Sequence, residues 1–570
     1  MLTQTTIHKV KIILSFCFLA IVVRLLMLQM HQREVYQERS LKNYLRFEKV
    51  LSLRGDIVDC NDVIIATNEP MTSLWWQGHG SHTLSVEQQT LFDYLVKKFK
   101  LEQPTVAQIA MCERFERQVM LCKQISLADV SDIIERFPLS PNILIKTSYK
   151  RYYPYQSMSC HLIGYLGSLS SLYPKGVMGL EKACEEPLHG VDGVKQTVIN
   201  SFGKHIQESA IQDALAGQQI KTTLDIKIQQ ALEEAFGEEW HGAGIIMCPQ
   251  TGAIRALLSR PTFDPQLFLE PLTSDQWNSL QKDRPFVNRA LEGTFPPASL
   301  FKLVTATAAL ETHICSPHNH WFCPGYATYA GRQYRCNKKE GHGELDFMTG
   351  LAFSCNIPFF EIGKKISINT LADYAHRLGL GEPTGIILPE KCGLIPSKEW
   401  KMHSFHQSWY QGETLSAAIG QSYLLVTPIQ MARLLGGIVE GYLVKPRILD
   451  NEPVEKRSVK IDPASRSFVK QSMIQVARIG SGRALSILKN ITIYAKTGTG
   501  QVMTNIHTDH DSKEDELKRT YEQRPHGWFI AHVSTENHPP LVIVILLEHS
   551  GTSSPARAIA QRVIQKVFLS

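Results

Sequence analysis

An apolar run close to the N-terminus constrains this chain more than any other feature. The run, Ile12–Met30, has 19 residues, and Arg24 is its one charged member. A helix of that length rises about 28 Å, which is enough to cross the hydrocarbon core of a bilayer. Lys9 and Lys11 precede the run, and basic residues favour the cytoplasmic side of a membrane. We therefore expect a transmembrane helix with residues 1–11 as a cytoplasmic tail.

Two other interpretations of this run remain open. A cleaved signal peptide would end in a small-residue cleavage site, and no A-x-A-like sequence follows the run. A buried helix of a soluble protein is the third alternative. Later apolar segments are shorter, and the seven residues Leu541–Leu547 fit a buried strand instead. An uncleaved single anchor is the favoured prediction, with most of the chain outside the cytoplasm.

Composition excludes several classes of protein. The chain has 570 residues, which predicts two to four domains. Its 43% hydrophobic and 20% charged residues are globular values, so a disordered, collagen-like or polytopic membrane protein is excluded. The net charge of +6 is dispersed along the chain, and we expect no nucleic-acid partner. Twelve cysteines are too few for a disulfide scaffold.

The remaining chain divides near residue 220. Residues 31–220 combine a polar, helix-compatible stalk at 31–50 with a mixed domain, and residues 221–570 form a second domain. In the second domain the helix Ile226–Phe236 follows Thr223 and Asp225, either of which can cap it. Strands are expected at 243–247, 253–258, 491–500, 527–533 and 541–548, with helices at 299–435 and 556–567. Strands at both ends with helices between them predict an α+β fold, one sheet covered by helices.

The clearest chemical signal surrounds Ser299. Pro296 and Pro297 precede it and an apolar helical stretch follows, so Ser299 is expected at a helix N-terminus. Backbone N–H groups there favour developing negative charge. Lys302 lies one helical turn later and can activate the serine only as a neutral amine. Because burial and a second cation both lower a lysine pKa, this pattern predicts serine acyl transfer without histidine.

Two further motifs follow Ser299 in order. The Ser-x-x-Lys motif alone is weak evidence for a nucleophile, because it also occurs at Ser467–Lys470 and Ser486–Lys489. We interpret these two occurrences as surface helix residues. Ser354-Cys355-Asn356 and then Lys496-Thr497-Gly498-Thr499 give the signal its specificity. β-Lactamases and penicillin-binding proteins combine these three elements.

With these motifs the chain resembles a class B penicillin-binding protein, a monofunctional peptidoglycan transpeptidase, over nearly everything after the anchor. The resemblance implies a serine transpeptidase/β-lactamase-like catalytic domain and a mixed α+β, dimerisation-type pedestal at residues 31–220. The chemistry would need no cofactor. The supporting segments are Arg54–Ile57, Arg151–Pro154, Gly179–Glu181, Thr251–Ile254 and Asn288–Ala290.

The resemblance implies roles for the catalytic residues. Ser299 attacks the penultimate D-alanine carbonyl of a pentapeptide stem and expels the terminal D-alanine. Lys302 is the base for acylation, and Ser354 relays the proton to the leaving amine. An acceptor amine from a neighbouring stem then closes the cross-link. β-Lactams, which mimic the D-alanyl-D-alanine end, should acylate the same serine.

The remaining motif residues are implied in substrate binding. Asn356 holds the stem-peptide amide, and Lys496 tunes the site. Thr497, Gly498 and Thr499 form the substrate-binding segment, in which the two threonines receive the substrate carboxylate. Backbone N–H groups of Ser299 and Thr499 would form the oxyanion hole.

Other segments resemble the elongation-type branch, penicillin-binding protein 2, and the division-type branch remains the alternative. Ala298 and Ser422 stand where the family usually has glycine. The segments that carry this resemblance are Gly341–Leu345, Trp409, Gly412–Leu415, Ile419–Leu424 and Thr427–Gln430.

A metal site is also expected. Cys323, Cys336, His342 and Cys355 offer three thiolates and an imidazole, a tetrahedral zinc set. Some elongation-type relatives carry zinc near the second motif, so the resemblance implies a structural zinc that clamps Ser354 and Asn356. A Cys323–Cys336 disulfide or unpaired thiols are the alternatives.

The resemblance further implies partners and a location. The expected partner is a membrane-embedded SEDS-type glycosyltransferase of the elongation complex, and the expected location is the inner membrane with the catalytic domain in the periplasm. A β-lactamase, a β-lactam sensor, a carboxypeptidase and an idle scaffold are the competing functions. The charged stretch Asp509–Arg524 is expected to be a solvated loop, with a substrate-side lid as the alternative.

Overall fold

A computed structural model describes residues 4–31, 34, 36, 44–101, 106–138, 140–167, 174–199, 205–270, 272–488, 490–502 and 521–569. Most of the expected loop Asp509–Arg524, Lys489 and most of the polar segment 31–43 lie outside these residues. The chain forms two compact units. The first contains Met1–Gly55, Asn68–Arg151 and His189–Gln218, and the second contains Asp56–Thr67, Tyr152–Leu188 and Gln219–Ser570.

The first unit begins with the expected apolar helix. Helix α1 (Gln4–Leu26) continues into the π-helical turn η1 (Met27–His31). Within it, Lys11–Met30 is long and apolar enough to cross a membrane by length and composition, and no other helix of the described segments passes that test. The apolar side chains of Phe16 and Phe18 are exposed, as a lipid-facing helix requires.

The stalk expected to be helix-compatible ends in a strand. Strand β1 (Leu45–Val50) pairs antiparallel with β8 (Gly193–Ile199), which pairs with β9 (His205–Gln212). The helical expectation is therefore wrong for residues 45–50. Local sequence favoured it, whereas the pairing partner of β1 lies far along the chain and satisfies its backbone groups.

The rest of the first unit is a small α+β core. The second part of β3 (Ile64–Gln77) pairs with β4 (Gln118–Cys122), and β5 (Ile143–Tyr152) also pairs with β3. Trp76 and Phe92 are buried in its centre with their rings edge to face. The helices are α3 (Val86–Phe99), α4 (Val106–Arg114) and α5 (Leu127–Arg136). Ser85 caps α3 and Ser126 caps α5, each with a complete capping box.

The second unit is built on a five-stranded antiparallel sheet in the order β12-β11-β21-β20-β19. The strands are β11 (Gly242–Met247), β12 (Ile254–Arg260), β19 (Thr492–Gly500), β20 (His526–Ser534) and β21 (Leu541–Leu547). All five lie where strands were expected. Helix α9 has the predicted bounds Ile226–Phe236, and the Asp225 carboxylate caps it by accepting from two backbone N–H groups.

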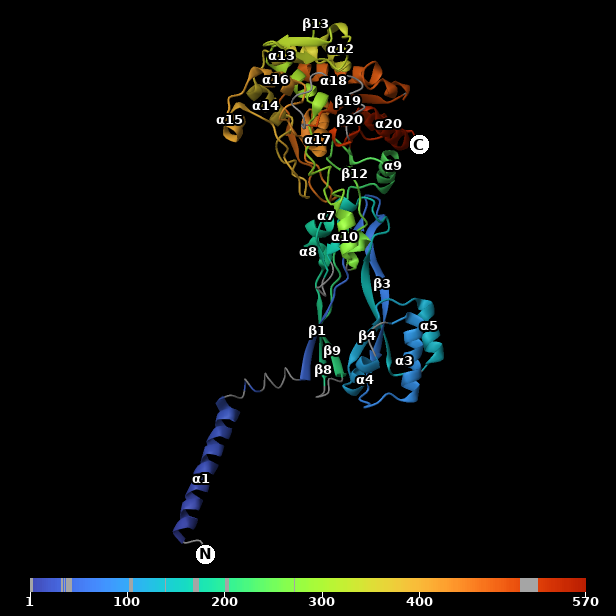
Figure 1. Ribbon diagram of the computed structural model, residues 1–570, viewed down its shortest axis with the longest axis vertical. Coiled ribbons are helices and arrows are strands. Elements are labelled where there is room, and N and C mark those ends of the chain that lie inside the picture. Colours follow the sequence, from blue (N-terminus) through green and yellow to red (C-terminus); the bar gives the residue numbers. More distant parts are fainter. Residues whose placement is uncertain are drawn as a thin grey trace. The chain divides into compact units, whose positions relative to one another are not determined.

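Helices cover both faces of this sheet, which confirms the predicted fold class. On one face α9 and α20 (Ser554–Phe568) lie next to each other (Figure 1). They share a hydrophobic core with Phe529 and Ile543. On the other, α11 (Lys302–Glu311) and α17 (Pro428–Glu440) share a core with Ile530 and Val544. Successive side chains along each strand point to opposite faces of the sheet, so they enter two separate hydrophobic cores.

Shorter elements complete the second unit. Its first part contains β2 (Ile57–Val58), α6 (Cys160–Ile163), β6 (Leu166–Gly167), β7 (Lys175–Gly176), α7 (Gly179–Ala183), α8 (Glu185–His189) and β10 (Ile220–Lys221). The elements between the sheet strands are η2 (Pro265–Leu269), α10 (Ser274–Gln281), η3 (Ala298–Leu300), β13 (His320–Cys323), β14 (Tyr326–Tyr329), β15 (Arg332–Arg335), β16 (Gly343–Asp346), α12 (Phe347–Ala352), α13 (Ile357–Gly363), α14 (Ile368–Arg377), α15 (Lys398–Phe405), α16 (Gln411–Ala418), β17 (Tyr442–Val444), β18 (Lys456–Ser458), α18 (Pro463–Arg478), η4 (Arg483–Ile487) and η5 (Tyr521–Gln523).

Candidate active site

Ser299 lies in a 3₁₀ turn that leads directly into α11. Ala298, immediately before it, has a left-handed φ of 50°, and its N–H donates to the Gly420 carbonyl over 2.8 Å. The buried indole of Trp528 donates to the Pro296 carbonyl over 3.0 Å. The nucleophile turn is thus fastened to two separate elements, and the half-buried Ser299 remains accessible.

Lys302 is fully buried one turn after Ser299. Its ammonium nitrogen donates to the Ser354 carbonyl and to Asn356 Oδ1, both over 2.7 Å. Burial lowers the pKa of Lys302 to about 8. The neutral amine that a serine nucleophile needs is therefore accessible near neutral pH.

A second buried lysine reaches the same serine. Lys496 Nζ donates to Ser354 Oγ over 2.9 Å, and Lys302 Nζ lies 3.4 Å from that oxygen. Burial, and then the charge of Lys302, lower the pKa of Lys496 well below its ordinary value. Within the residues that the structure describes, Ser299 Oγ has no hydrogen bond. Ser354, rather than Ser299, is the hydroxyl that joins the two lysines.

Both polar atoms of the Asn356 side-chain amide have hydrogen-bond partners. Its Oδ1 accepts from Lys302, and its Nδ2 donates to the carbonyl of Arg335, the last residue of β15, over 2.9 Å. Its backbone N–H points to Cys336 Sγ at 3.4 Å. Ser354, two residues earlier, has a left-handed φ of 56°. These contacts fix the second motif between the buried lysine and the hairpin β14–β15.

Thr497, Gly498 and Thr499 lie on β19, which is the last strand of its sheet. A Cβ on Gly498 would lie 3.2 Å from Leu300 Cγ and 3.3 Å from the Pro297 carbonyl oxygen. Glycine therefore lets this strand approach the nucleophile turn closely. Among the described residues no strand pairs with the outer side of β19, and such an edge can add an extended peptide by backbone hydrogen bonds.

The structure therefore brings the three sequence motifs together. Lys302 and Lys496 join the first and third motifs to Ser354, and Gly498 packs against the turn that carries Ser299. A nucleophile, two lysines of lowered pKa and a peptide-accepting strand edge can carry out acyl transfer.

The four expected metal ligands also converge. The donor atoms of Cys323, Cys336, His342 and Cys355 all lie within 4.8 Å of one another. His342 Nδ1 is 3.5 Å from the sulfurs of Cys323 and Cys336, and the Cys336 and Cys355 sulfurs are 3.6 Å apart. Tetrahedral zinc, with bonds of about 2.3 Å to sulfur and about 2.0–2.1 Å to nitrogen, places its ligand atoms roughly 3.5–3.8 Å apart.

The chemistry of these cysteines suits a cation. A hydrogen bond from Cys355 lowers the pKa of the Cys336 thiol, so that a thiolate forms there readily. Both Cys323 and Cys336 are free thiols, so the alternative disulfide between them is not formed. The donor set therefore fits a zinc ion in its number, type and spacing.

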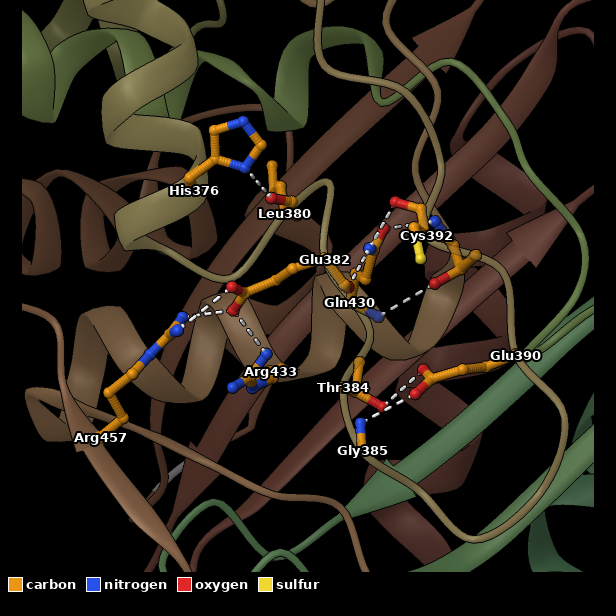
Figure 2. A network of polar contacts seen from close by, with 11 residues as sticks. His376, Leu380, Glu382, Thr384, Gly385, Glu390, Cys392, Gln430, Arg433 and Arg457 are labelled. Carbon is orange, nitrogen blue, oxygen red and sulfur yellow. Dashed lines mark hydrogen bonds and ion pairs between the residues drawn. The ribbon is translucent and has the colours of Figure 1, made fainter.

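A polar network beyond these motifs was missed by sequence reasoning. Gln430, buried on α17, donates to the carbonyls of Glu382 and Cys392 over 2.9 and 2.7 Å and so joins both ends of one loop (Figure 2). The Glu382 carboxylate accepts from Arg433 over 3.0 Å and also from Arg457 (Figure 2).

The loop continues toward the nucleophile turn. Leu394 pairs with Leu425, and the next residue, Val426, pairs with Phe295, which precedes Ser299 by four positions. The motif Thr427–Gln430 was noted in the sequence only as a mark of the family branch. The carbonyls that Gln430 binds lie about 40 residues earlier in the chain, and no local sequence pattern predicts these contacts.

Comparison with known proteins assigns the site to a family. Residues 242–568 match the family described as penicillin binding protein transpeptidase domain. Residues 49–222 match the penicillin-binding protein dimerisation domain. The chain therefore belongs to the penicillin-binding protein transpeptidase family.

Individual relatives match almost the full length. The chain is 28% identical over 575 residues to the peptidoglycan D,D-transpeptidase MrdA of Escherichia coli (strain K12), covering 94% of this chain and 89% of that protein. A chain in the structure "Structural coordination of polymerization and crosslinking by a peptidoglycan synthase complex" is 26% identical, with a TM-score of 0.76, and the match covers 99% of this chain and 98% of that chain. The penicillin-binding protein of Helicobacter pylori solved in complex with MreC shares the fold, with a TM-score of 0.75 at 24% identity over 92% of this chain and 99% of that chain.

These matches confirm the predicted class. The protein is a serine-type transpeptidase of the penicillin-binding class with a dimerisation-type second domain, and its relatives are elongation-type members. The division-type alternative is less supported, because the MrdA relatives cover nearly the whole chain.

Proposed function

We propose that this protein cross-links peptidoglycan during cell elongation through a Ser299 acyl-enzyme. The observation that carries the proposal is the pair of buried lysines that meet at Ser354 Oγ next to the nucleophile turn. That arrangement supplies a proton acceptor for Ser299 and a path for the proton to the leaving group.

The first half-reaction makes the acyl-enzyme. Ser299 Oγ forms a bond to the penultimate D-alanine carbonyl carbon while its proton passes to neutral Lys302. The bond from that carbon to the terminal D-alanine nitrogen then breaks, and Ser354 passes its proton to the departing amine and regains one from Lys302. Lys302 and Lys496 lie on either side of the Ser354 hydroxyl, which supports this relay.

The second half-reaction transfers the acyl group. The amine of a neighbouring stem peptide attacks the Ser299 ester carbonyl, and the new amide bond forms as the bond from the acyl carbon to Ser299 Oγ breaks. The proton that the amine loses returns to the serine. Backbone N–H groups of Ser299 and Thr499 would stabilise the oxyanion in both steps. Thr497 and Thr499 would receive the donor carboxylate, and Asn356 the stem-peptide amide.

The membrane arrangement is part of the proposal. The apolar helix fits an anchor at residues 12–30, with a cytoplasmic tail at 1–11, a pedestal at 31–220 and a transpeptidase domain at 221–570 in the periplasm. A relative belongs to a complex described as coordinating polymerization and crosslinking, which supports a SEDS-type glycosyltransferase as partner in the inner membrane.

A structural zinc completes the proposal. Cys323, Cys336, His342 and Cys355 would hold it, and the tetrahedral spacing of their donor atoms supports this assignment. The ion would supply only rigidity. Because Cys355 is the middle residue of the second motif and Cys336 Sγ accepts from the Asn356 N–H, the cluster would keep Asn356 in register with Lys302.

The test is a cross-linking assay with the full-length protein in detergent. Nascent peptidoglycan with pentapeptide stems is the substrate, and released D-alanine and dimeric muropeptides are measured together. We expect one D-alanine for each cross-link, and neither product with Ser299→Ala. D-Alanine release without cross-links would indicate a carboxypeptidase instead. Equal cross-linking by Ser299→Ala would contradict the proposal.

A further inference from the structure

A short turn after α18 brings an unassigned hydroxyl to the third motif. Ser481 Oγ lies 2.5 Å from Thr497 Oγ1, so one hydroxyl donates to the other. Thr497 is buried with 5% of its surface exposed, whereas Ser481 is half-buried. Ser481 belongs to none of the three family motifs, and its partner is one of the two threonines proposed to bind the donor carboxylate.

The backbone of Ser481 is fixed on both sides. Its N–H donates to the Ala352 carbonyl over 3.3 Å, at the end of the helix that precedes Ser354. Gly480 permits this contact, since a Cβ there would lie 2.1 Å from the Ala352 carbonyl oxygen. The turn therefore connects the second motif with the third, and Ser481 has little freedom to move away from Thr497.

A cation holds the remaining backbone group of Ser481. Arg557, in the first turn of α20, donates from Nη1 to the Ser481 carbonyl over 2.8 Å. Arg557 has no acidic partner among the residues of this unit that the structure describes. Arg557 contacts Ser481, and Ser481 contacts Thr497, the proposed carboxylate-binding residue. A half-buried guanidinium without a carboxylate partner at this place is suited to binding an anion.

Hydrogen-bond direction links these observations to the substrate. A carboxylate only accepts hydrogen bonds, so Thr497 can bind it only by donating its own proton. While it donates, the Thr497 oxygen can still accept a hydrogen bond, and the Ser481 hydroxyl is placed to donate one to it. A chain of aligned hydroxyl groups strengthens its last donor, because each bond polarises the next.

We propose that Ser481 and Arg557 complete the subsite for the terminal carboxylate of the donor peptide. Ser481 is a positioning residue, which orients the Thr497 hydroxyl toward the carboxylate. Arg557 holds Ser481 in place and adds positive charge. This inference rests on the proposed function, since it requires the donor to bind along β19.

The test compares two probes that differ only in the carboxylate. Benzylpenicillin and its methyl ester are reacted with the full-length protein in detergent, and the second-order rate of acylation is followed by intact mass. Ser481→Ala and Arg557→Gln are the variants, and Ser481→Thr keeps the hydroxyl. Two matched controls are Ser486→Ala, whose hydroxyl donates to the Arg483 carbonyl, and Arg562→Gln, whose guanidinium donates to the Ala235 carbonyl from the same helix.

We expect Ser481→Ala and Arg557→Gln to slow acylation by the free acid about tenfold, because the Thr497 hydroxyl then loses the hydrogen bond, or the nearby positive charge, that prepares it to bind the carboxylate. The methyl ester should react with all variants at rates within about twofold of the unmodified protein, because no charged carboxylate is present. Ser481→Thr and the two controls should resemble the unmodified protein with both probes.

Equal slowing with both probes would overturn the inference, because it would mean that Ser481 only supports the fold. Unchanged rates in Ser481→Ala, with acylation still abolished in Ser299→Ala, would overturn this inference alone. Absence of acylation in the unmodified protein would overturn the proposed function and the inference together.

Discussion

Lys496 donates a hydrogen bond of 2.9 Å to the hydroxyl of Ser354, although 142 positions separate the two residues in the chain. Both groups are buried, so the bond operates away from bulk water. With Lys302 on the other side, Ser354 is a hydroxyl between two amines whose pKa values are both lowered by burial. In the proposed mechanism, catalysis therefore depends on proton exchange among these three buried groups.

Lys302→Arg should slow acylation strongly while the protein stays folded. Arginine keeps the positive charge and most hydrogen bonds to Ser354 and Asn356, but it cannot lose its proton at any usable pH. We expect the acylation rate to fall by about 10²–10⁴, the usual contribution of a general base. Stopped-flow acylation with a chromogenic cephalosporin measures it. Lys364→Arg, in a surface ion pair with Glu361, is the control, and a fall below threefold in Lys302→Arg would contradict the base role.

Trp528→Phe should loosen the nucleophile turn. The phenyl ring keeps the packing but removes the indole N–H and leaves the buried Pro296 carbonyl without its donor. We expect a loss of about 1–3 kcal/mol in unfolding free energy and slower acylation at Ser299. Urea unfolding and acylation rates measure the two effects. Trp277→Phe, at a 43% exposed position on α10, should change neither, and an unaffected Trp528→Phe would exclude this anchoring role.

Acid should destabilise the transpeptidase unit through two buried histidines. Burial lowers the pKa of both His161 and His526 to about 4. His161 points to the Pro285 carbonyl with Arg260 and Arg289 nearby, and His526 accepts from the His549 N–H. Since the unfolded chain takes up protons near pH 6.5, stability is complete above that pH and is lost as the pH falls toward 4.

Melting curves between pH 4 and pH 8 check this expectation. The melting temperature should fall steadily below pH 6.5, and His526→Gln should reduce the slope, because one titrating group is then absent. His403→Gln, on the exposed face of α15, should leave the slope unchanged. A melting temperature that stays constant from pH 6.5 to pH 4 would show that protonation of these buried histidines does not destabilise the protein.

Removing one proposed metal ligand should remove the metal and lower the stability of the protein. Cys336→Ser weakens the cluster and removes the sulfur that accepts from the Asn356 N–H. We expect the bound zinc measured by mass spectrometry to disappear, and the melting temperature to fall by about 5 °C or more. Cys392→Ser, outside the cluster, should retain the metal. One equivalent of zinc in Cys336→Ser, or none in the unmodified protein, would argue against the site.

The sequence was sufficient for regular elements whose patterns are local. The five sheet strands and helix α9 were predicted because each shows its own apolar pattern or cap. The ordered motifs also identified which distant segments share one site. Strand β1 was missed because its stability depends on β8, which lies about 150 positions later.

The contacts within the site were less predictable. Sequence spacing places Lys302 beside Ser299, yet its ammonium nitrogen bonds to Ser354 and Asn356. Nothing in the local sequence of Ser481 indicates that it meets Thr497. Such pairings are set by how helices and strands pack, and a one-dimensional pattern does not encode that packing.

The most direct test of the central claim is the intact mass of the full-length protein after reaction with benzylpenicillin. The account predicts a stable adduct equal to the mass of the drug, located on the peptide that contains Ser299 and absent in Ser299→Ala. An adduct that persists in Ser299→Ala would contradict Ser299 as the nucleophile. Rapid hydrolysis of the drug without an adduct would indicate a β-lactamase, and an intact drug without an adduct would indicate an idle scaffold.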